Sequence, residues 1–191
     1  MGEPSGSDLK AVDLEQISLF ALAPQPLLIL LGSLLGDIVP VKVHQRHREP
    51  ATWRWQPDQQ AISFRTSEPS SAGSSQIVAL KLALSATTTD DRIRSVLGAD
   101  ECIWELTAED PHNDIMRRPE DLSKFKRQVR QLLDRIKTAH GEDVVVNVFP
   151  ALPSSCAVEL GRIRMPKADL PFRIYDQNAQ AGGFVQTLMI T

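Results

Sequence analysis

The sequence predicts an α/β protein with largely parallel sheets, built from two βαβ halves. Short apolar segments of strand length alternate along the chain with longer segments in which apolar residues recur at helical spacing. This alternation is typical of parallel sheets, because consecutive parallel strands are joined by helical crossovers. A β–turn–α–β pattern also occurs twice. With 191 residues, 42% of them hydrophobic and 24% charged, the chain is long enough to bury a core.

The first half opens with one βαβ unit. Residues 17–23 read as a buried strand, and the turn at residues 24–26 starts a helix that ends near residues 36–37. Proline in the first turn suits a helix start, and glycine suits a helix end. Residues 39–45 alternate between apolar and polar side chains, which predicts a second strand.

A predicted hairpin and a linker follow. Residues 52–56 and 61–66 would pair as short strands across a Pro-Asp turn. Residues 67–75 are rich in Ser, Gly and Pro and read as a linker, the best internal boundary of the chain. We therefore expect a flexible N-terminal linker, a first half and a second half: residues 1–14, about 15–70 and about 76–191.

The second half continues the alternation. Residues 76–85 are apolar except for one lysine, as expected of a strand covered on both faces. A short helix follows from Asp90 or Asp91 to about Leu97, and a long amphipathic helix spans residues 119–140. The remaining expected elements are strands at 101–106, 144–149, 171–175 and 184–190 and a helix at 154–164.

Part of the first half recurs in the second. Residues 20–24 (Phe-Ala-Leu-Ala-Pro) align with residues 149–153 (Phe-Pro-Ala-Leu-Pro) at an offset of 129, and Gly32 falls on Gly161 at the same offset. Residues 40–45 match residues 171–176 two positions later in register. We infer two Rossmann-like units packed side by side, with the carboxyl ends of their strands along one rim. Ligands of open α/β sheets bind at such a rim, and a pseudo-symmetric cleft suits a pseudo-symmetric ligand carrying several phosphates.

The two proline-containing turns are the first candidate ligand site. Backbone N–H groups at the start of a helix bind phosphate without a basic side chain. The structural alternative is that Pro24 only sets a turn and Ser154 only caps its helix. The residues expected at the rim from these turns and from neighbouring strand ends are Pro24, Gln25, Pro26, Ser85, Thr87, His112, Asn113, Pro153, Ser154 and Ser155.

Polar and aromatic side chains near the rim are the second candidate. Gln45, His47 and Arg48 offer amide, imidazole and guanidinium groups for bases or phosphates, unless they are simply a solvated loop. Trp53 and Trp55 share one face of the predicted strand and either stack a base or belong to the core. We expect Gln45, His47, Arg48, His112 and Asn113 to contact bases or phosphates of the ligand, and Trp53 or Tyr175 to stack a base. Lys81, inside an apolar strand, is either paired or snorkelling, which we expect, or a phosphate ligand reached from within the sheet.

Composition excludes several classes of protein. The formal net charge of −3 argues against a broad basic surface for DNA. No nucleotide-binding, hydrolase or zinc-protease motif occurs, and His44 and His47 lack partners at metal-ligand spacing. Cys102 and Cys156 lie in apolar stretches, which favours a reducing cytosol. There is no signal peptide or membrane-length apolar run, so we expect a cytoplasmic protein without a metal or cofactor.

The motifs resemble those of one family. The segments that carry the resemblance are residues 20–35 (beginning Phe-Ala-Leu-Ala-Pro-Gln-Pro), 43–48 (Val-His-Gln-Arg-His-Arg), 53–55 (Trp-Arg-Trp), 149–153 (Phe-Pro-Ala-Leu-Pro), 158–162 (Val-Glu-Leu-Gly-Arg), 165–171 and 174–178. The first three resemble the opening of a SAVED domain, and the others resemble its close. Together they bracket residues of about 15 to 191, nearly the whole chain.

The resemblance implies a sensor of bacterial antiphage defence (CBASS) made of two fused CARF-like halves. Its implied ligand is a cyclic dinucleotide, such as a cGAMP isomer, or a cyclic trinucleotide, made by a partner nucleotidyltransferase (CD-NTase). Binding would drive oligomerisation and switch on a fused effector, most similar to the HNH endonuclease of HNH–SAVED proteins. No effector occurs in this sequence, so it is either an excised or a stand-alone sensor, itself no enzyme. Two alternatives stay open: a ring nuclease, and an oligomerisation module with a degenerate pocket.

Overall fold

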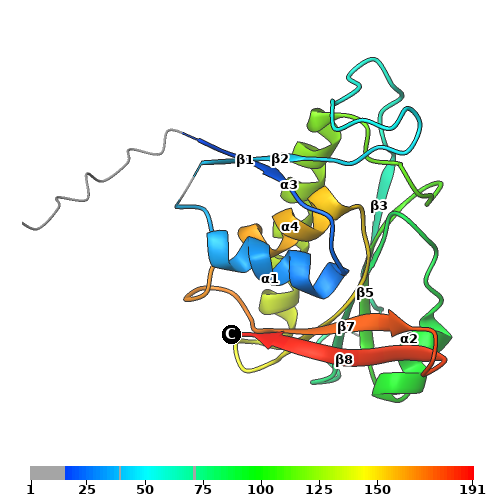
Figure 1. Ribbon diagram of the computed structural model, residues 1–191. Coiled ribbons are helices and arrows are strands. Elements are labelled where there is room, and N and C mark those ends of the chain that lie inside the picture. The colour runs from blue at the N-terminus through cyan, green and yellow to red at the C-terminus, as the bar shows by residue number, and fades with distance from the viewer. Residues whose placement is uncertain (1–15, 39, 71) are drawn as a thin grey trace, which may run out of the picture.

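Most of the helices lie between a small and a large β-sheet in this protein (Figure 1). The computed structural model describes residues 16–191 except residues 39 and 71, so the predicted N-terminal linker at 1–14 lies outside the described residues. The large sheet contains six strands and the small sheet two. This mixed α/β architecture, with mostly parallel pairing, confirms the predicted fold class.

The large sheet has the strand order β3-β5-β4-β6-β7-β8. Its strands are β3 (Phe64–Ser67), β4 (Val78–Ala83), β5 (Cys102–Ala108), β6 (Val146–Ala151), β7 (Phe172–Asn178) and β8 (Gly183–Ile190). The four central strands are parallel, and the edge strands β3 and β8 are antiparallel to their neighbours. Every residue of β4 is buried, as the continuous apolar run predicts for a central strand.

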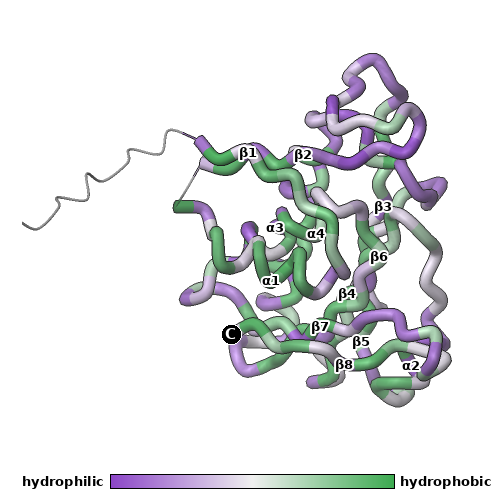
Figure 2. Tube along the Cα trace, in the orientation of Figure 1, coloured by the Kyte–Doolittle hydropathy of each residue, from purple (hydrophilic) through white to green (hydrophobic). Residues whose placement is uncertain are grey.

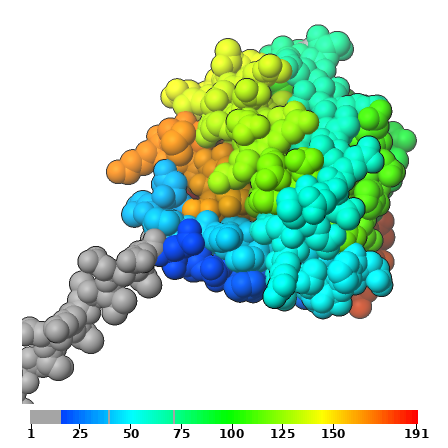
Figure 3. Space-filling view, turned by 90° about the horizontal axis from the view of Figure 1, so that it is seen from above, coloured from blue at the N-terminus to red at the C-terminus, as the bar shows by residue number. Residues whose placement is uncertain are grey.

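The small sheet pairs β1 (Ile17–Phe20) with β2 (Val41–His44) in parallel. The prediction that residues 17–23 form a buried strand is wrong in length and in burial: the strand ends at Phe20, whose side chain is 53% exposed. Helices cover only one face of this two-stranded sheet, so alternate residues face outward. Figure 3 looks down on the side of the molecule where β1 and β2 lie next to each other.

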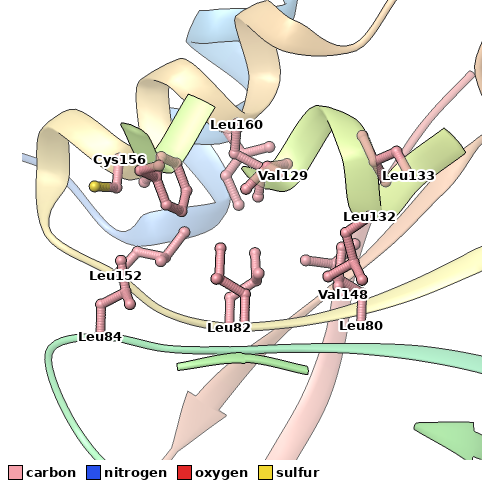
Figure 4. Packing of buried hydrophobic residues seen from close by; sticks show 14 of the residues in the cluster. Leu80, Leu82, Leu84, Val129, Leu132, Leu133, Val148, Leu152, Cys156 and Leu160 are labelled. Carbon is pink, nitrogen blue, oxygen red and sulfur yellow. The ribbon is translucent and has the colours of Figure 1, made fainter. Parts of the chain in front are cut away.

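Four helices complete the fold: α1 (Gln25–Leu35), α2 (Asp90–Leu97), α3 (Pro119–His140) and α4 (Ser154–Ile163). The predicted apolar stripe of α3 is buried against β4 and β6, so that Val129 and Leu132 lie over Leu82 and Val148 in Figure 4. Figure 2 shows that α1 is hydrophobic over most of its length. Helix α2 covers the opposite face of the large sheet through Ile93.

The predicted hairpin is wrong. Thr52 forms only an isolated bridge with His47, and Trp53 and Trp55 therefore do not lie on a strand face. The second predicted strand shifts to β3 and pairs antiparallel with β5 of the large sheet. Hydrogen bonds from Arg117 to the Glu49 carbonyl and the Gln56 side chain hold this segment as an irregular loop.

The internal repeat is confirmed in three dimensions. The unit β1–α1–β2 corresponds to the unit β6–α4–β7, and both strand pairs are parallel. Their registers are equivalent: Ile17 lies opposite Val41 as Val146 lies opposite Phe172. Even the entry hydrogen bonds match, from Ile17 N–H to the Pro40 carbonyl and from Val146 N–H to the Pro171 carbonyl, both 2.9 Å.

The two units meet where α1 crosses α4 at glycines. A Cβ on Gly32 would lie 1.9 Å from the Val158 carbonyl oxygen, and a Cβ on Gly161 would lie 1.9 Å from the Ile29 carbonyl oxygen. Ile29 and Val158 are themselves equivalent at the offset of 129. The two contacts are therefore equivalent. A pseudo-two-fold axis that relates the two units passes between the glycines.

Candidate functional site

The pseudo-two-fold axis between Gly32 and Gly161 reaches the surface at the rim formed by the carboxyl ends of the strands, where α1 and α4 both begin. The Leu152 N–H donates to the Gln25 side chain at 2.9 Å, which joins the first turn of α1 to the turn before α4. On the other side of that turn, the Ser85 N–H donates to the Ala151 carbonyl, and the His112 N–H to the Leu84 carbonyl. Loops following β1, β4, β5 and β6 therefore converge at one place, as predicted for the carboxyl ends of parallel strands.

Gln45 closes the start of α4. Its side chain is buried, and its Oε1 accepts from the Ser155 N–H at 3.0 Å and from the Ser154 hydroxyl at 3.3 Å. Its Nε2 donates to the Arg46 carbonyl. The cap of this helix is thus a side chain from the other unit, because Pro153 at the N-cap position provides no side-chain hydrogen bond. The N–H of Ser155, expected to be open to a phosphate, is already bonded.

The first turn of α1 also offers fewer free backbone N–H groups for a phosphate than the sequence predicts. Pro26 has no N–H, and the N–H groups of Leu27 and Leu28 both bond to the Pro24 carbonyl. Pro24 is exposed and Pro26 is buried. Helix termini therefore shape the rim more than they supply hydrogen-bond donors, and side chains must provide most of its polarity.

A polar cluster of the buried His47 with the partly buried Asp114 and Arg117 anchors the loop after β2. His47 is fully buried, with Nδ1 3.4 Å from the Asp114 carboxylate. The same carboxylate accepts from the N–H groups of Arg48 and Glu49 and is paired with Arg117. Burial lowers the pKa of His47 below its ordinary value of 6.5, although Asp114 opposes the shift. His47 thus positions this loop from within, whereas the side chain of Arg48 is exposed.

An aromatic cluster lies at the carboxyl ends of β1 and β2. The rings of Phe20 and His44 stack with centroids 4.2 Å apart and planes 11° apart. Trp53 meets Phe20 edge-on at 5.4 Å, and the guanidinium of Arg46 lies 5.9 Å from the Trp53 ring centroid. Trp53 was predicted at the rim, but Phe20 and His44 were not selected as ligand residues. The sequence signal that could have identified Phe20 and His44 is their alignment with Phe149 and Tyr175 in the repeat.

A pocket of about 390 Å³ opens beside the end of β5. Its polar lining includes Ser63, Glu109, His112, Asp114 and Arg117. Two of the predicted residues, His112 and Asn113, are exposed in the loop that borders it, and Thr87 is exposed after β4. Asp114 and Arg117 were not selected from the sequence, because ordinary loop residues reveal their pairing only when the loop after β2 is placed against them.

Tyr175 and Lys81 lie on the face of the large sheet that α2 covers. Tyr175 is buried and stacks on Phe149, so the fold does not bring it to the rim residues. Lys81 is paired with Asp90 at 2.6 Å and with Glu105 at 2.9 Å, which is the predicted core pairing. Burial disfavours its charge, but these two carboxylates outweigh burial and raise the pKa of Lys81.

The described part of the chain contains no group of three or more His, Cys, Asp or Glu side chains that could hold a metal ion. No helix in residues 16–191, apart from the two undescribed positions, is long and apolar enough to cross a membrane.

Comparison with known proteins identifies the family. Residues 7–190 match the family model described as the "SMODS-associated and fused to various effectors sensor domain", or SAVED. The chain belongs to the SAVED family. The match covers nearly the whole sequence, so the family resemblance of the motifs is confirmed. No curated protein matches this SAVED chain.

Solved SAVED structures share its fold. The Acinetobacter baumannii Cap4 SAVED/CARF-domain receptor with 3′3′3′-cAAA has a TM-score of 0.64 at 13% identity, covering 91% of this chain and 38% of that one. With 2′3′3′-cAAA the values are 0.63, 14%, 91% and 37%. A further Cap4 receptor structure gives 0.59, 13%, 91% and 35%. The present chain thus spans little more than a third of the Cap4 receptors.

Proposed function

We propose that this SAVED domain senses a cyclic di- or trinucleotide, bound at the rim where the pseudo-two-fold axis emerges. One observation carries the proposal: the two βαβ units are related by the axis between Gly32 and Gly161, and both helices begin at that rim. A cyclic oligonucleotide repeats its phosphates and bases around a ring, so a pair of equivalent helix starts matches its symmetry. The cyclic trinucleotides named for the Cap4 receptors support this ligand class.

The proposed contacts come from the loops gathered at the rim. Pro24, Gln25 and Ser154 line the point where the axis emerges, because the Gln25 side chain bonds to the turn before α4. Further proposed contacts are Ser85 and Thr87 after β4, His112 and Asn113 after β5, and Arg48 and Trp53 after β2. Gln45, His47, Pro26, Pro153 and Ser155 are buried and would hold these loops in place rather than touch the ligand first.

Thermal melting against a panel of cyclic di- and trinucleotides of defined linkage tests the proposal. A ligand at about 100 times its dissociation constant stabilises the folded state by about 2.7 kcal/mol. For a domain of this size the melting temperature rises by several degrees. We expect one ring to raise it while its linkage isomers do not. A flat response from folded protein to every verified ligand contradicts the sensor proposal.

The nucleotide that stabilises the protein in this panel also separates the sensor from the ring-nuclease alternative. We propose that the domain holds its ligand without cleaving it. After prolonged incubation, chromatography of the stabilising nucleotide is expected to recover the intact ring. Accumulation of a linear product in proportion to protein concentration contradicts this part of the proposal.

We further propose that ligand binding drives self-association in the bacterial cytoplasm and so activates an effector, such as an HNH endonuclease, in a CBASS system. The description of the family as fused to various effectors supports this arrangement. The burial of Cys102 and Cys156 among apolar side chains suits a reducing compartment. Light scattering after size-exclusion chromatography is expected to give a larger mass with the ring than without it. An unchanged mass at saturating ligand contradicts the switch.

A further inference from the structure

The repeat places two equivalent aromatic clusters in the molecule. Phe20 corresponds to Phe149 at the offset of 129, and His44 corresponds to Tyr175 at the offset of 131. Phe20 and His44 stack at 4.2 Å and 11°, while Phe149 and Tyr175 stack at 4.6 Å and 14°. The same ring pair has thus been kept on the outer face of each sheet.

A third ring and an arginine complete each cluster. Trp53 meets Phe20 edge-on at 5.4 Å with Arg46 over it, and Phe184 meets Phe149 edge-on at 5.0 Å. Arg92 lies 5.1 Å from the Phe184 ring centroid. Trp53 and Phe184 are also separated by the offset of 131 that relates His44 to Tyr175, whereas Arg46 and Arg92 do not correspond to each other in the repeat.

The clusters differ in what covers them. Phe149 is fully buried and Tyr175 is 5% exposed, because Ile93 of α2 and Phe184 of β8 pack on them. Phe20 is 53% exposed, and no helix corresponding to α2 lies over it among the described residues. The first cluster is therefore an aromatic surface that is open on its outer side.

The surroundings of the open cluster favour a nucleotide over an apolar protein cover. Lys42 is exposed and precedes His44 by two residues on the strand, so both lie on the outer face. Arg46 supplies a second cation beside Trp53. The buried cluster of Phe149 and Tyr175 is covered instead by α2, which contributes the apolar side chain of Ile93. A flat ring flanked by two positive charges matches a base and its phosphate.

We propose that Phe20 and His44, supported by Trp53, form a stacking surface for one base of the cyclic oligonucleotide, with Arg46 and Lys42 facing its phosphate. This inference rests on the proposed function, because it assigns part of the ligand to the edge of the rim. It places base recognition at the first unit only. The equivalent surface of the second unit is closed by α2 and β8 and takes no base.

Titration of the full chain with 3′3′3′-cAAA, or with whichever ring stabilises it in the melting panel, tests the assignment. Phe20→Ala is expected to weaken binding about 5- to 100-fold, since a base loses one stacking partner. Phe20→Tyr keeps a stacking ring and is expected to bind within about threefold of wild type. Leu34→Ala removes a similarly exposed apolar side chain at the far end of α1 and serves as the matched control.

Three other outcomes overturn the assignment. If wild-type protein binds and Phe20→Ala binds equally well, the stacking surface is wrong while the sensor proposal stands. If wild type binds no ring in the panel, the sensor proposal fails and this inference fails with it. If Phe20→Ala abolishes self-association of nucleotide-free protein and leaves affinity unchanged, the open cluster is a protein-binding surface instead.

Discussion

The units β1–α1–β2 and β6–α4–β7 share register, helix crossing and aromatic pair, yet one is core and the other is largely surface. The second unit is flanked by β4 and β8 and covered by α2 and α3, whereas the first forms a sheet of its own. The same pattern of residues therefore gives buried or exposed side chains according to its neighbours. Local sequence determines the unit, and the flanking strands determine its burial.

The helices show the same contrast. α4 is buried over seven consecutive positions because it lies among α1, α3 and the large sheet. α1 is almost entirely apolar, but Leu27 and Leu34 are 53% and 77% exposed. A helix that is hydrophobic all round is normally buried on every side. Helix α1 of the first unit therefore has the amino-acid composition of a buried helix, although part of it lies at the surface.

The largest expected effect comes from the shared helix crossing. Gly32→Ala and Gly161→Ala each place a methyl group against a backbone carbonyl, so each is expected to destabilise the fold by more than about 3 kcal/mol. Chemical denaturation of both variants measures the loss. Gly183→Ala, whose Cβ would meet nothing within 4 Å, is the control and should be nearly neutral. Tolerance of alanine at either crossing glycine would break the equivalence of the two units.

The equivalent phenylalanines sharpen the comparison. Phe149→Ala leaves a cavity under α2 and is expected to cost about 3–5 kcal/mol of unfolding free energy. Phe20→Ala is expected to cost at most about 1 kcal/mol, because its ring is half in solvent. Denaturation of the two variants in parallel gives the difference. Equal losses would mean that the first cluster is covered in solution.

Gln45 tests the link between the units. Gln45→Ala removes the acceptor of the Ser155 N–H at the start of α4, and we expect a loss of about 1–2 kcal/mol. Amide hydrogen exchange in the first turn of α4 should rise in this variant. Gln60→Ala, at an exposed loop position, is the matched control. Unchanged exchange in α4 would show that the cap contributes nothing.

The smallest effect is a pH dependence that arises from His47 in the loop after β2. The pKa of His47 is lowered by burial, so the folded protein holds a neutral imidazole where the unfolded chain takes up a proton. This contribution to stability is therefore complete above the unfolded pKa of 6.5 and is lost as the pH falls toward the lowered folded pKa. Melting temperatures between pH 7.5 and 5 measure it. His47→Gln should flatten that part of the curve, and an identical curve would contradict the assignment.

The sequence predicts the central architecture well because its signals are local. The α3 stripe, the continuous apolar β4 and the repeated turns depend on periodicity within one element. The false hairpin at Trp53 and the buried strand ending at residue 23 failed because tertiary contacts decide them. Asp114 and Arg117 hold the Trp53 loop from 61 or more residues away, and no local pattern contains that information.

The meeting of the rim loops could be predicted from the sequence, whereas the partners of the individual side chains could not. Gln25, Ser154, Ser85 and His112 do converge at the rim, because strand polarity fixes where the loops after β1, β4, β5 and β6 emerge. The individual roles depend on side-chain partners. Gln45 is engaged with α4 and His47 with Asp114, and Tyr175 lies on the far face of the sheet. Only the fold distinguishes a residue that faces the rim from one that supports it.

Calorimetric titration with cyclic oligonucleotides and with linear oligonucleotides of the same composition tests the central claim most directly. If two equivalent units together form one site at their common rim, one ring binds per chain and the linear form binds at least about tenfold more weakly. Two rings per chain would mean that each unit binds separately. Equal affinity for ring and linear chain, or no binding to any ring, would contradict a shared pseudo-symmetric site.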